Sequence, residues 1–198
     1  VFEKPQDFNH FLPGQYAIIA LDHPKFTELD MALRPMSIVS HPSEKVLRFA
    51  MRESKSAFKQ SCMSMQPGDT AKLYGPKGDF TLKSNDRGLV FLISGIGITP
   101  VISMLKELEV KKSKKKIILI YSNRYQESTA YDTDLKNIAL KNFKYVNRLT
   151  SEEGRVDMEF IKKQVEDFDA FDYYMVGTTP FLSNIKKGLL SKGLNPKQ

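Results

Sequence analysis

The chain has 198 residues, of which 41% are hydrophobic and 27% charged, a balance typical of a globular protein with one large domain or two small ones. No stretch approaches the roughly 18 apolar residues of a membrane-spanning helix, and the single cysteine, Cys62, excludes an internal disulfide, an iron–sulfur cluster or a cysteine-rich zinc site built from this chain alone. We therefore expect a protein of a reducing cytoplasm without a membrane span, whose formal net charge of +7 predicts an anionic partner such as a nucleotide, an acidic redox protein or nucleic acid.

The first part of the chain consists of short β-like runs separated by turn residues. Breakers such as Pro13-Gly14, Pro67-Gly68 and Gly75-Pro76 punctuate it, a spacing typical of a small antiparallel barrel or sandwich. One short helix is predicted over 56–65. The predicted strands cover residues 15–21, 36–40, 46–52, 70–74 and 79–82. The expected first strand of the barrel is short or absent at Val1, which would leave an exposed sheet edge, so we expect the natural chain to be longer.

The pattern changes near Asp86, after which buried strands alternate with helices. Residues 89–94 form a continuous apolar run, as a parallel strand covered on both faces should, and the next segment carries apolar residues at Val101, Leu105 and Leu108. This alternation predicts a parallel sheet with helices on both faces. The predicted strands cover 89–94, 117–121, 145–149 and 173–176, and the predicted helices cover 100–110, 133–140, 158–165 and 180–190. We therefore predict two domains, residues 1–86 and 87–198.

The densest charge cluster is the lysine-rich run 111–116. It lies between an amphipathic segment and an apolar run, so we interpret it as a solvated helix-to-strand turn, with a binding patch as the alternative. A nucleic-acid-binding protein would interleave basic residues with exposed aromatic side chains on one face, whereas these lysines scatter or cluster at a turn. The sequence therefore favours a partner other than nucleic acid. No Ser-His-Asp set, metal-ligand cluster or paired-carboxylate site stands out.

A glycine-containing turn follows the first buried strand of the second part. Gly95 and Gly97 allow a tight turn close to an anion, Thr99 offers a hydroxyl at the helix start, and Pro100 suits the first helical turn. The amides and the dipole at such a helix start favour a pyrophosphate. An ordinary strand-to-helix turn explains the glycines equally well, because Pro100 and Val101 stand where a dinucleotide fingerprint has its third glycine and the next strand does not end in an acidic residue.

Five short segments stand out in chain order. They are Arg34-Pro35-Met36-Ser37, Gly75-Pro76-Lys77-Gly78-Asp79-Phe80, Gly95-Ile96-Gly97-Ile98-Thr99-Pro100, Gly154-Arg155-Val156 and Tyr174-Met175-Val176-Gly177-Thr178-Thr179-Pro180. They resemble, in this order, the R-x-Y-S, G-P-x-G-x-F, G-x-G-x-T-P, G-R-[IV] and Y-x-C-G-P motifs of the ferredoxin-NADP reductase superfamily. The resemblance runs from about Leu12 to the C-terminus. It implies an N-terminal antiparallel flavin-binding β-barrel over 1–86, incomplete at its start, followed by a parallel-sheet α/β nicotinamide-binding domain over 87–198.

The resemblance implies that the first segment binds a flavin. Arg34, with its permanently charged fork of donors, would contact the flavin phosphates. The Ser37 hydroxyl would hydrogen-bond near flavin N5, which makes Ser37 the predicted catalytic residue. Pro35 and Met36 complete the segment, and Met36 replaces an aromatic residue with a softer platform for the flavin ring. The alternatives are an ion pair for Arg34, core packing for Met36 and a surface position for Ser37.

A second phosphate-binding segment of the family corresponds to Ser56, Ala57, Phe58 and Lys59. Ser56 can cap a helix whose first amides would bind a phosphate, with Lys59 as the counter-charge. Helix capping alone explains Ser56 equally well. The resemblance implies FAD as the flavin, with FMN as the alternative.

The remaining segments would bind NADH or NADPH. The predicted contacts come from the glycine turn, the end of the next strand and the last motif: Gly95, Ile96, Gly97, Thr99, Pro100, Asn123, Arg124, Val176, Gly177, Thr178, Pro180 and Phe181. Val176 replaces a cysteine of the family, so any assistance from a thiol is absent, although the cofactors themselves carry out hydride transfer. Arg124 could reach a 2′-phosphate, but the loop 149–151 lacks the arginine of NADPH-using relatives, so the choice of dinucleotide stays open.

The function that the resemblance implies is that of a flavoprotein reductase. Hydride would pass from NAD(P)H to the flavin between the two domains, and electrons would pass on to a ferredoxin or flavodoxin, whose acidity would suit the positive charge. Alternatively, the chain is the reductase subunit of a larger complex of the oxygenase or hydrogenase type. A third alternative is a relative that binds nucleotides without catalysis, which Met36 and Val176 leave open.

Overall fold

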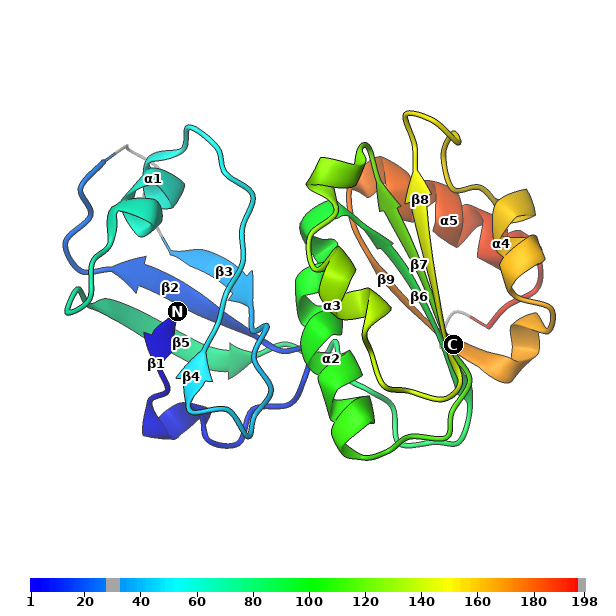
Figure 1. Ribbon diagram of the computed structural model, residues 1–198, viewed down its shortest axis with the longest axis horizontal. Helices are drawn as coiled ribbons and strands as arrows, with labels where there is room; N and C mark the ends of the chain where they lie inside the picture. Colours follow the sequence, from blue (N-terminus) through cyan, green and yellow to red (C-terminus); the bar gives the residue numbers. More distant parts are fainter. Residues whose placement is uncertain (28–32, 196–198) are drawn as a thin grey trace. The chain divides into compact units, whose positions relative to one another are not determined.

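The computed structural model describes residues 1–27 and 33–195 (Figure 1). Contacts divide the chain into two compact units. The first unit contains Val1–Leu82 together with Thr99–Met104, and the second contains Lys83–Ile98 together with Leu105–Gln198. A domain boundary between residues 86 and 87 stays a prediction. No helix within the two described stretches is long and apolar enough to cross a membrane.

The N-terminal part contains two small antiparallel sheets and one helix. Its elements are β1 (Phe2–Glu3), β2 (Tyr16–Leu21), β3 (Arg34–Ser37), β4 (Val46–Leu47), α1 (Ala57–Ser64) and β5 (Ala71–Lys77). β2 lies at the centre of a three-stranded sheet between β3 and β5, and β1 pairs with β4. The core beneath them is apolar and consists of Phe8, Phe11, Ala17, Ile38 and Leu47.

Three predicted strands of this part were wrong: the strand predicted over 36–40 is β3 at Arg34–Ser37, the strand over 46–52 ends at Leu47, and the strand over 79–82 does not form. The chain leaves the strand pattern after Leu47 because the Arg48 amide donates to the Ser40 hydroxyl (3.1 Å) instead of to a ladder carbonyl. Residues 79–82 form no strand, whereas β5 continues to Lys77. It ends at Gly78, whose φ of +95° lies in the left-handed region and whose missing side chain leaves room for the Tyr16 ring, 2.9 Å from where a Cβ would stand.

The C-terminal part is a four-stranded parallel sheet covered by helices. Its elements are β6 (Gly88–Ser94), α2 (Ile98–Val110), β7 (Ile117–Asn123), α3 (Asp132–Lys136), β8 (Phe143–Leu149), α4 (Met158–Gln164), β9 (Phe171–Val176) and α5 (Thr179–Ser191). Helices α2 and α3 lie on one face of the sheet, and α4 and α5 lie on the other (Figure 1). The antiparallel sheets and this parallel sheet confirm the predicted fold class.

Burial on both faces explains why these strands read as continuous apolar runs. Val90 and Leu92 of β6 and Ile118 and Ile120 of β7 pack into one cluster with residues of α4 and α5, and the intervening strand residues are buried as well. Each fully buried side chain of this kind contributes about 1.5–3 kcal/mol. Helix α3 is shorter than predicted, because the Ala139 amide donates to a Glu109 carboxylate oxygen (2.7 Å) instead of continuing the helix.

A buried carboxylate fixes the segment that leads into β6. The Asp172 side chain of β9 is 3% exposed; its Oδ2 accepts a hydrogen bond from Asn85 Nδ2 (2.7 Å), and its Oδ1 lies 3.3 Å from Lys83 Nζ and 3.4 Å from Arg87 Nε. The Lys83 amide also donates to the hydroxyl of Tyr174 (2.9 Å). Residues 83–87 are therefore held against β9 by polar bonds that the sequence pattern did not predict.

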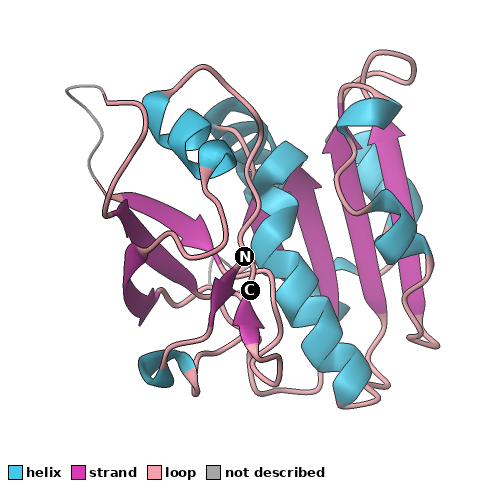
Figure 2. Cartoon of the chain, turned by 60° about the vertical axis from the view of Figure 1, so that its left-hand side comes forward, coloured by secondary structure: helices cyan, strands magenta, loops and turns pink. Residues whose placement is uncertain are grey.

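The strand order β8-β7-β6-β9 places a reversal of winding between β6 and β9. All neighbouring pairs are parallel, so the carboxyl ends of the four strands meet at one edge, and Figure 2 shows the arrows pointing the same way. In open α/β sheets, ligands bind in the crevice outside the carboxyl ends where the strand order reverses. This edge is where a functional site is expected.

Candidate functional site

A cavity of about 650 Å³ lies at the carboxyl edge of the parallel sheet. Four hydroxyl-bearing residues line it, one at or just after the end of each strand: Ser94, Ser122, Thr150 and Thr178. The start of α4 and the first turns of α5 complete the lining with Arg155, Val156, Asp157, Met158, Pro180, Phe181, Asn184 and Ile185. A mostly apolar cavity with a few convergent polar groups suits a ligand that has both rings and phosphates or hydroxyls.

Two glycines pack the loops after β6 and β9 against each other. A Cβ on Gly97 would lie 2.9 Å from Val176 Cγ1, and a Cβ on Gly177 would lie 2.3 Å from Ser94 Oγ. The Thr178 amide also donates weakly to Ser94 Oγ at 3.4 Å. Close packing of the protein alone therefore requires glycine at both positions, and it places Ser94 and Thr178 side by side at the cavity.

The glycine turn also prepares the start of α2. Gly95 adopts a left-handed φ of +54°, and its carbonyl accepts a hydrogen bond from the buried Tyr121 hydroxyl (2.9 Å). Helix α2 begins at Ile98 with Thr99 and Pro100 in its first turn and no acidic residue there. The positive end of this helix dipole is therefore not neutralised by its own first turn, as an anion-binding helix start requires.

The cavity lining contains one cation without a carboxylate partner. Of the described lining residues only Arg155 and Asp157 carry charge. The Asp157 carboxylate is occupied as the N-cap of α4, where Oδ1 accepts from the Phe160 amide (2.8 Å). Arg155 is exposed and forms no hydrogen bond or ion pair within residues 1–27 and 33–195. Its guanidinium is therefore available to a phosphate.

The predicted dinucleotide contacts fall into two groups around this cavity. Thr178, Pro180 and Phe181 line it, and Gly97 and Gly177 lie in the packed loops beside it. Gly95, Ile96, Thr99, Pro100 and Val176 belong to the same two loops and the first turn of α2 but are not part of the lining.

The structure does not bring Asn123 and Arg124 into the lining. Asn123 is 3% exposed, and its Nδ2 donates to Asn147 Oδ1 (3.4 Å). The Arg124 guanidinium lies 5.1 Å from the ring centroid of Tyr125, and its carbonyl accepts from the Ser151 amide. Both residues stay predicted contacts that lie outside the lining.

Sequence reasoning missed nine of the twelve residues that line this cavity, among them three hydroxyl residues and Arg155. Ser94, Ser122 and Thr150 were not proposed as contacts, although each stands at or just after a predicted strand end, where parallel strands converge. Arg155 lies in a motif that had been recognised, Gly154-Arg155-Val156, without a role being given to the arginine. The three hydroxyl residues could have been predicted from their positions at the carboxyl ends of the predicted strands.

On the first unit, the structure brings together the two segments predicted to bind flavin phosphates. Arg34 stands on β3, and its guanidinium lies 5.9 Å from the ring centroid of Phe58 on α1. Met36 and Ser37 are half-buried on the same strand, opposite Ala17 and Tyr16 of β2, and Pro35 is exposed. The two segments, 19 positions apart at their nearest residues, therefore meet at the start of α1.

The amino end of α1 has no side-chain cap among the described residues. Ser56 occupies the N-cap position, but its hydroxyl makes no capping bond to the helix and instead accepts from the Ser54 hydroxyl (3.4 Å). The first turn contains no acidic residue. The amides of Ala57 and Phe58 with the nearby Arg34 and Lys59 therefore fit a phosphate group.

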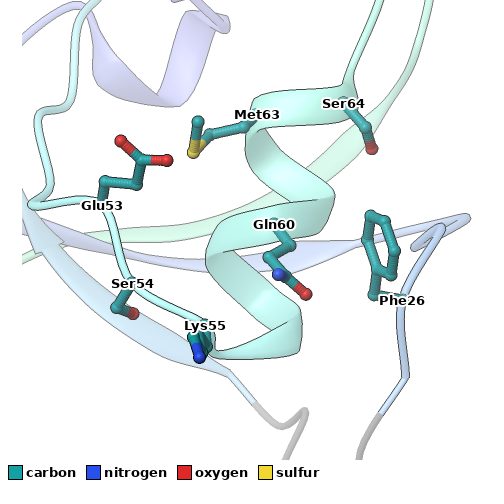
Figure 3. Close-up of a pocket in the computed structure, with 7 residues that line it drawn as sticks. All are labelled: Phe26, Glu53, Ser54, Lys55, Gln60, Met63 and Ser64. Atoms are coloured by element: carbon teal, nitrogen blue, oxygen red, sulfur yellow. The ribbon is translucent and has the colours of Figure 1, made fainter.

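A second cavity of about 570 Å³ flanks α1 (Figure 3). Gln60, Met63 and Ser64 project from the helix, with the segment 53–55 on one side and Phe26 on the other. Met63 and Phe26 are 57% and 40% exposed, which is high for large apolar side chains. Sequence reasoning did not identify this cavity, because its two walls are about 30 residues apart in the chain.

The chain thus combines an antiparallel β unit, whose helix α1 starts without a side-chain cap, with a parallel α/β unit that has a cavity at the carboxyl ends of its strands. Residues 91–187 match the oxidoreductase NAD-binding domain family. The family match, the relatives and the shared fold together support the ferredoxin-NADP reductase-like superfamily of flavin- and NAD-binding oxidoreductases.

Relatives of this superfamily match nearly the whole chain. The flavohemoprotein of Bacillus subtilis (strain 168) is 28% identical over 98% of this chain and 52% of its own length, and the ferredoxin reductase component of 3-ketosteroid-9-alpha-monooxygenase from Rhodococcus rhodochrous is 25% identical over 98% and 57%. The chain thus spans about half the length of the curated relatives it matches. The ferredoxin NADP+ reductase of Neisseria gonorrhoeae, solved with bound FAD and NADP, shares the fold with a TM-score of 0.82 at 21% identity, covering 99% of this chain and 85% of its own.

Proposed function

We propose that this chain is a flavoprotein reductase that takes hydride from NADH or NADPH onto a bound FAD and passes electrons to a redox protein. The observation that carries the proposal is the cavity at the reversal of strand order, where four hydroxyl residues and the unpaired Arg155 converge. A nicotinamide dinucleotide presents two riboses, a pyrophosphate and two rings, which these hydroxyls, this cation and the apolar side chain of Phe181 can bind.

The first unit supports flavin binding in the same way. Arg34 and the amides at the start of α1 would bind the phosphates. The cavity beside α1 favours FAD over FMN, because Phe26 and Met63 offer apolar surface for an adenine ring and the Glu53 carboxylate can accept from a ribose diol. FMN has no adenosine part, so this cavity would stay empty if FMN were the cofactor.

The residues of this chain would position and shield the cofactors. When bound, the nicotinamide and the flavin supply the hydride chemistry themselves. Ser37 would donate its hydroxyl proton in a hydrogen bond to the flavin ring, and Met36 would lie against the ring with its thioether. Val176, packed against Gly97, would help exclude water from the dinucleotide loop. No side chain is required to act as a nucleophile or as a general acid in this scheme.

The electron acceptor in this proposal is a ferredoxin- or flavodoxin-type protein. A second candidate is that the chain works as the reductase module of a larger system, which the Rhodococcus rhodochrous relative, a ferredoxin reductase component of a monooxygenase, favours. We place either function in the cytoplasm, in keeping with the single cysteine, Cys62.

The test uses the purified chain reconstituted with FAD. We expect a yellow protein whose flavin absorbance near 450 nm is bleached anaerobically by NADH or NADPH, with the preferred dinucleotide bleaching about tenfold faster or more. If the protein retains FAD but neither dinucleotide bleaches the flavin, the chain binds nucleotides without reductase activity. A chain that binds neither FAD nor dinucleotide would overturn the proposal.

A further inference from the structure

A basic concavity lies at the opposite edge of the parallel sheet from the dinucleotide cavity. It has a volume of about 440 Å³ at the amino ends of β7 and β8 and is lined by Lys114, Lys116, Lys141 and Lys144 around Ile117, Ile118, Asn142 and Phe143. No described lining residue is acidic. The strands are seven residues long, so about 20 Å separate this edge from the carboxyl edge.

The number of lysines at this edge equals the net charge of the whole chain. The run 111–116 contributes five lysines, and Lys141 and Lys144 add two; we call these seven residues the amino-edge lysine cluster. Without them the chain has 23 basic residues, the same number as its acidic residues. The cluster therefore equals the net positive charge in number and concentrates seven lysines at one edge of the sheet, where they create a directed field.

Most of this charge lacks an internal partner. Lys111 pairs with Glu107 one helical turn away, and Lys115 Nζ donates to the Asn85 carbonyl. In contrast, Lys112, Lys114, Lys141 and Lys144 are exposed and make no ion pair or hydrogen bond through their side chains within residues 1–27 and 33–195. Four like charges without counter-ions raise the free energy of the isolated protein, and an anionic partner would lower it.

The two loops that hold these lysines are joined by one side-chain and one backbone hydrogen bond. Asn142 Nδ2 donates to the Lys114 carbonyl (2.9 Å), and the Ile117 amide donates to the Asn142 carbonyl (2.9 Å). The sequence predicted a solvated turn at 111–116; the structure adds Lys141 and Lys144, about 25 residues later, to the same concavity. A pre-formed arrangement loses less entropy on binding than a free lysine tail would.

We propose that the amino-edge lysine cluster binds an acidic polypeptide segment of a partner protein. The half-buried Phe143 in the concavity and the 64% exposed Val110 beside the run suit an aliphatic side chain between carboxylates. A single-stranded nucleic acid would need exposed aromatic rings for base stacking, and Phe143 is half-buried. A membrane surface would need several exposed apolar side chains in one plane, whereas only Val110 adjoins the run. This inference does not depend on nucleotide binding.

The test compares two triple variants of the full chain with equal charge. K114Q/K141Q/K144Q removes lysines of the cluster, and K163Q/K186Q/K187Q removes exposed lysines of α4 and α5 on the same unit. Binding of a fluorescein-labelled glutamate-rich peptide is measured by anisotropy at roughly 50 mM and roughly 300 mM salt, with a glutamine-rich peptide of equal length as a further control. We expect the cluster variant to lose about tenfold or more in affinity and the control variant about twofold or less.

Equal losses in both variants would show a net-charge effect and overturn the proposal, as would equal binding of the glutamine-rich peptide. Oligouridylate and phosphatidylserine vesicles are tested as alternative ligands. If either binds the chain more tightly than the acidic peptide does, and binds the cluster variant more weakly, the assignment to a polypeptide is overturned. Unchanged FAD content and NAD(P)H bleaching in both variants confirm that the fold and the proposed reductase site are intact, so the two proposals fail separately.

Discussion

The guanidinium of Arg34 lies 5.9 Å from the ring centroid of Phe58, so a strand residue and a helix residue that are 24 positions apart share one site. This contact connects the segment predicted to bind flavin phosphates with the open amino end of α1. A cation beside a helix start without acidic residues supports the proposed phosphate site, because both the charge and the amides favour an anion.

Replacing Arg34 by Ala is expected to weaken FAD binding about tenfold to a hundredfold, since a charge-assisted hydrogen bond contributes about 1.5–3 kcal/mol. The measurement is the FAD content after gel filtration, together with the dissociation constant from flavin fluorescence. Lys45→Ala, on an exposed turn of the same unit, is the matched control. Full FAD retention by Arg34→Ala would remove this residue from the flavin site.

Ser37→Ala is expected to keep FAD bound while slowing anaerobic flavin reduction by about tenfold, because one hydrogen bond to the flavin ring is lost and the phosphates are still held. Stopped-flow absorbance at saturating NADH and NADPH measures this rate. Ser43→Ala, on an exposed turn of the same unit and outside the cavity beside α1, should reduce at the wild-type rate. A Ser37→Ala variant with unchanged reduction kinetics contradicts the predicted role.

Gly97→Val is expected to weaken dinucleotide binding by more than about tenfold and to leave FAD bound. The added atoms would enter the space of Val176, whose Cγ1 and carbonyl oxygen lie 2.9 and 3.0 Å from the Cβ position, so the loops after β6 and β9 must separate. Isothermal titration with NADP+ and NAD+ measures the affinity. In a Gly97→Ala background, Val176→Ala should restore part of the loss because it removes the Cγ1 contact. Normal turnover by Gly97→Val would refute the loop assignment.

Arg155→Gln is expected to weaken binding of both NADH and NADPH about tenfold, since no other described residue lining the cavity is a cation. Arg124→Gln is the matched control, because that guanidinium lies over the Tyr125 ring and outside the lining. Equilibrium titration of dinucleotide fluorescence gives both constants. If Arg124→Gln proves the more damaging change, the sequence-based interpretation of Arg124 was right and the cavity assignment is wrong.

Asp172→Asn is expected to lower the free energy of unfolding by about 2 kcal/mol, because it removes a nearly buried charge that faces Lys83 and Arg87 and disturbs the bond from Asn85. Urea unfolding followed by circular dichroism measures the change. The exposed α4 substitution Glu159→Gln should stay within about 0.5 kcal/mol of the wild type. A similar small effect for Asp172→Asn would mean that the segment 83–87 is held by other contacts.

Much of the fold was readable from the sequence because burial on both faces imposes a simple pattern. Strands β6 and β7 are continuous apolar runs, and the predicted elements of the second part match those observed to within a few residues, apart from the shorter α3. The first part was harder. Whether the chain after Leu47 forms a strand depends on the Ser40 hydroxyl, and the end of β5 depends on the space beside Tyr16, neither of which is a local property.

The sequence alone indicated the class of this protein, because five short motifs occur in the order found in the ferredoxin-NADP reductase superfamily. Only the tertiary structure decided which side chains share the dinucleotide cavity. The order β8-β7-β6-β9 brings Ser94, Ser122 and Thr150 to one edge and places Arg155, not Arg124, among the lining residues. Spacing along the chain cannot show which side chains share the cavity. The strand order depends on how the helical connections between strands pack on the twisted sheet.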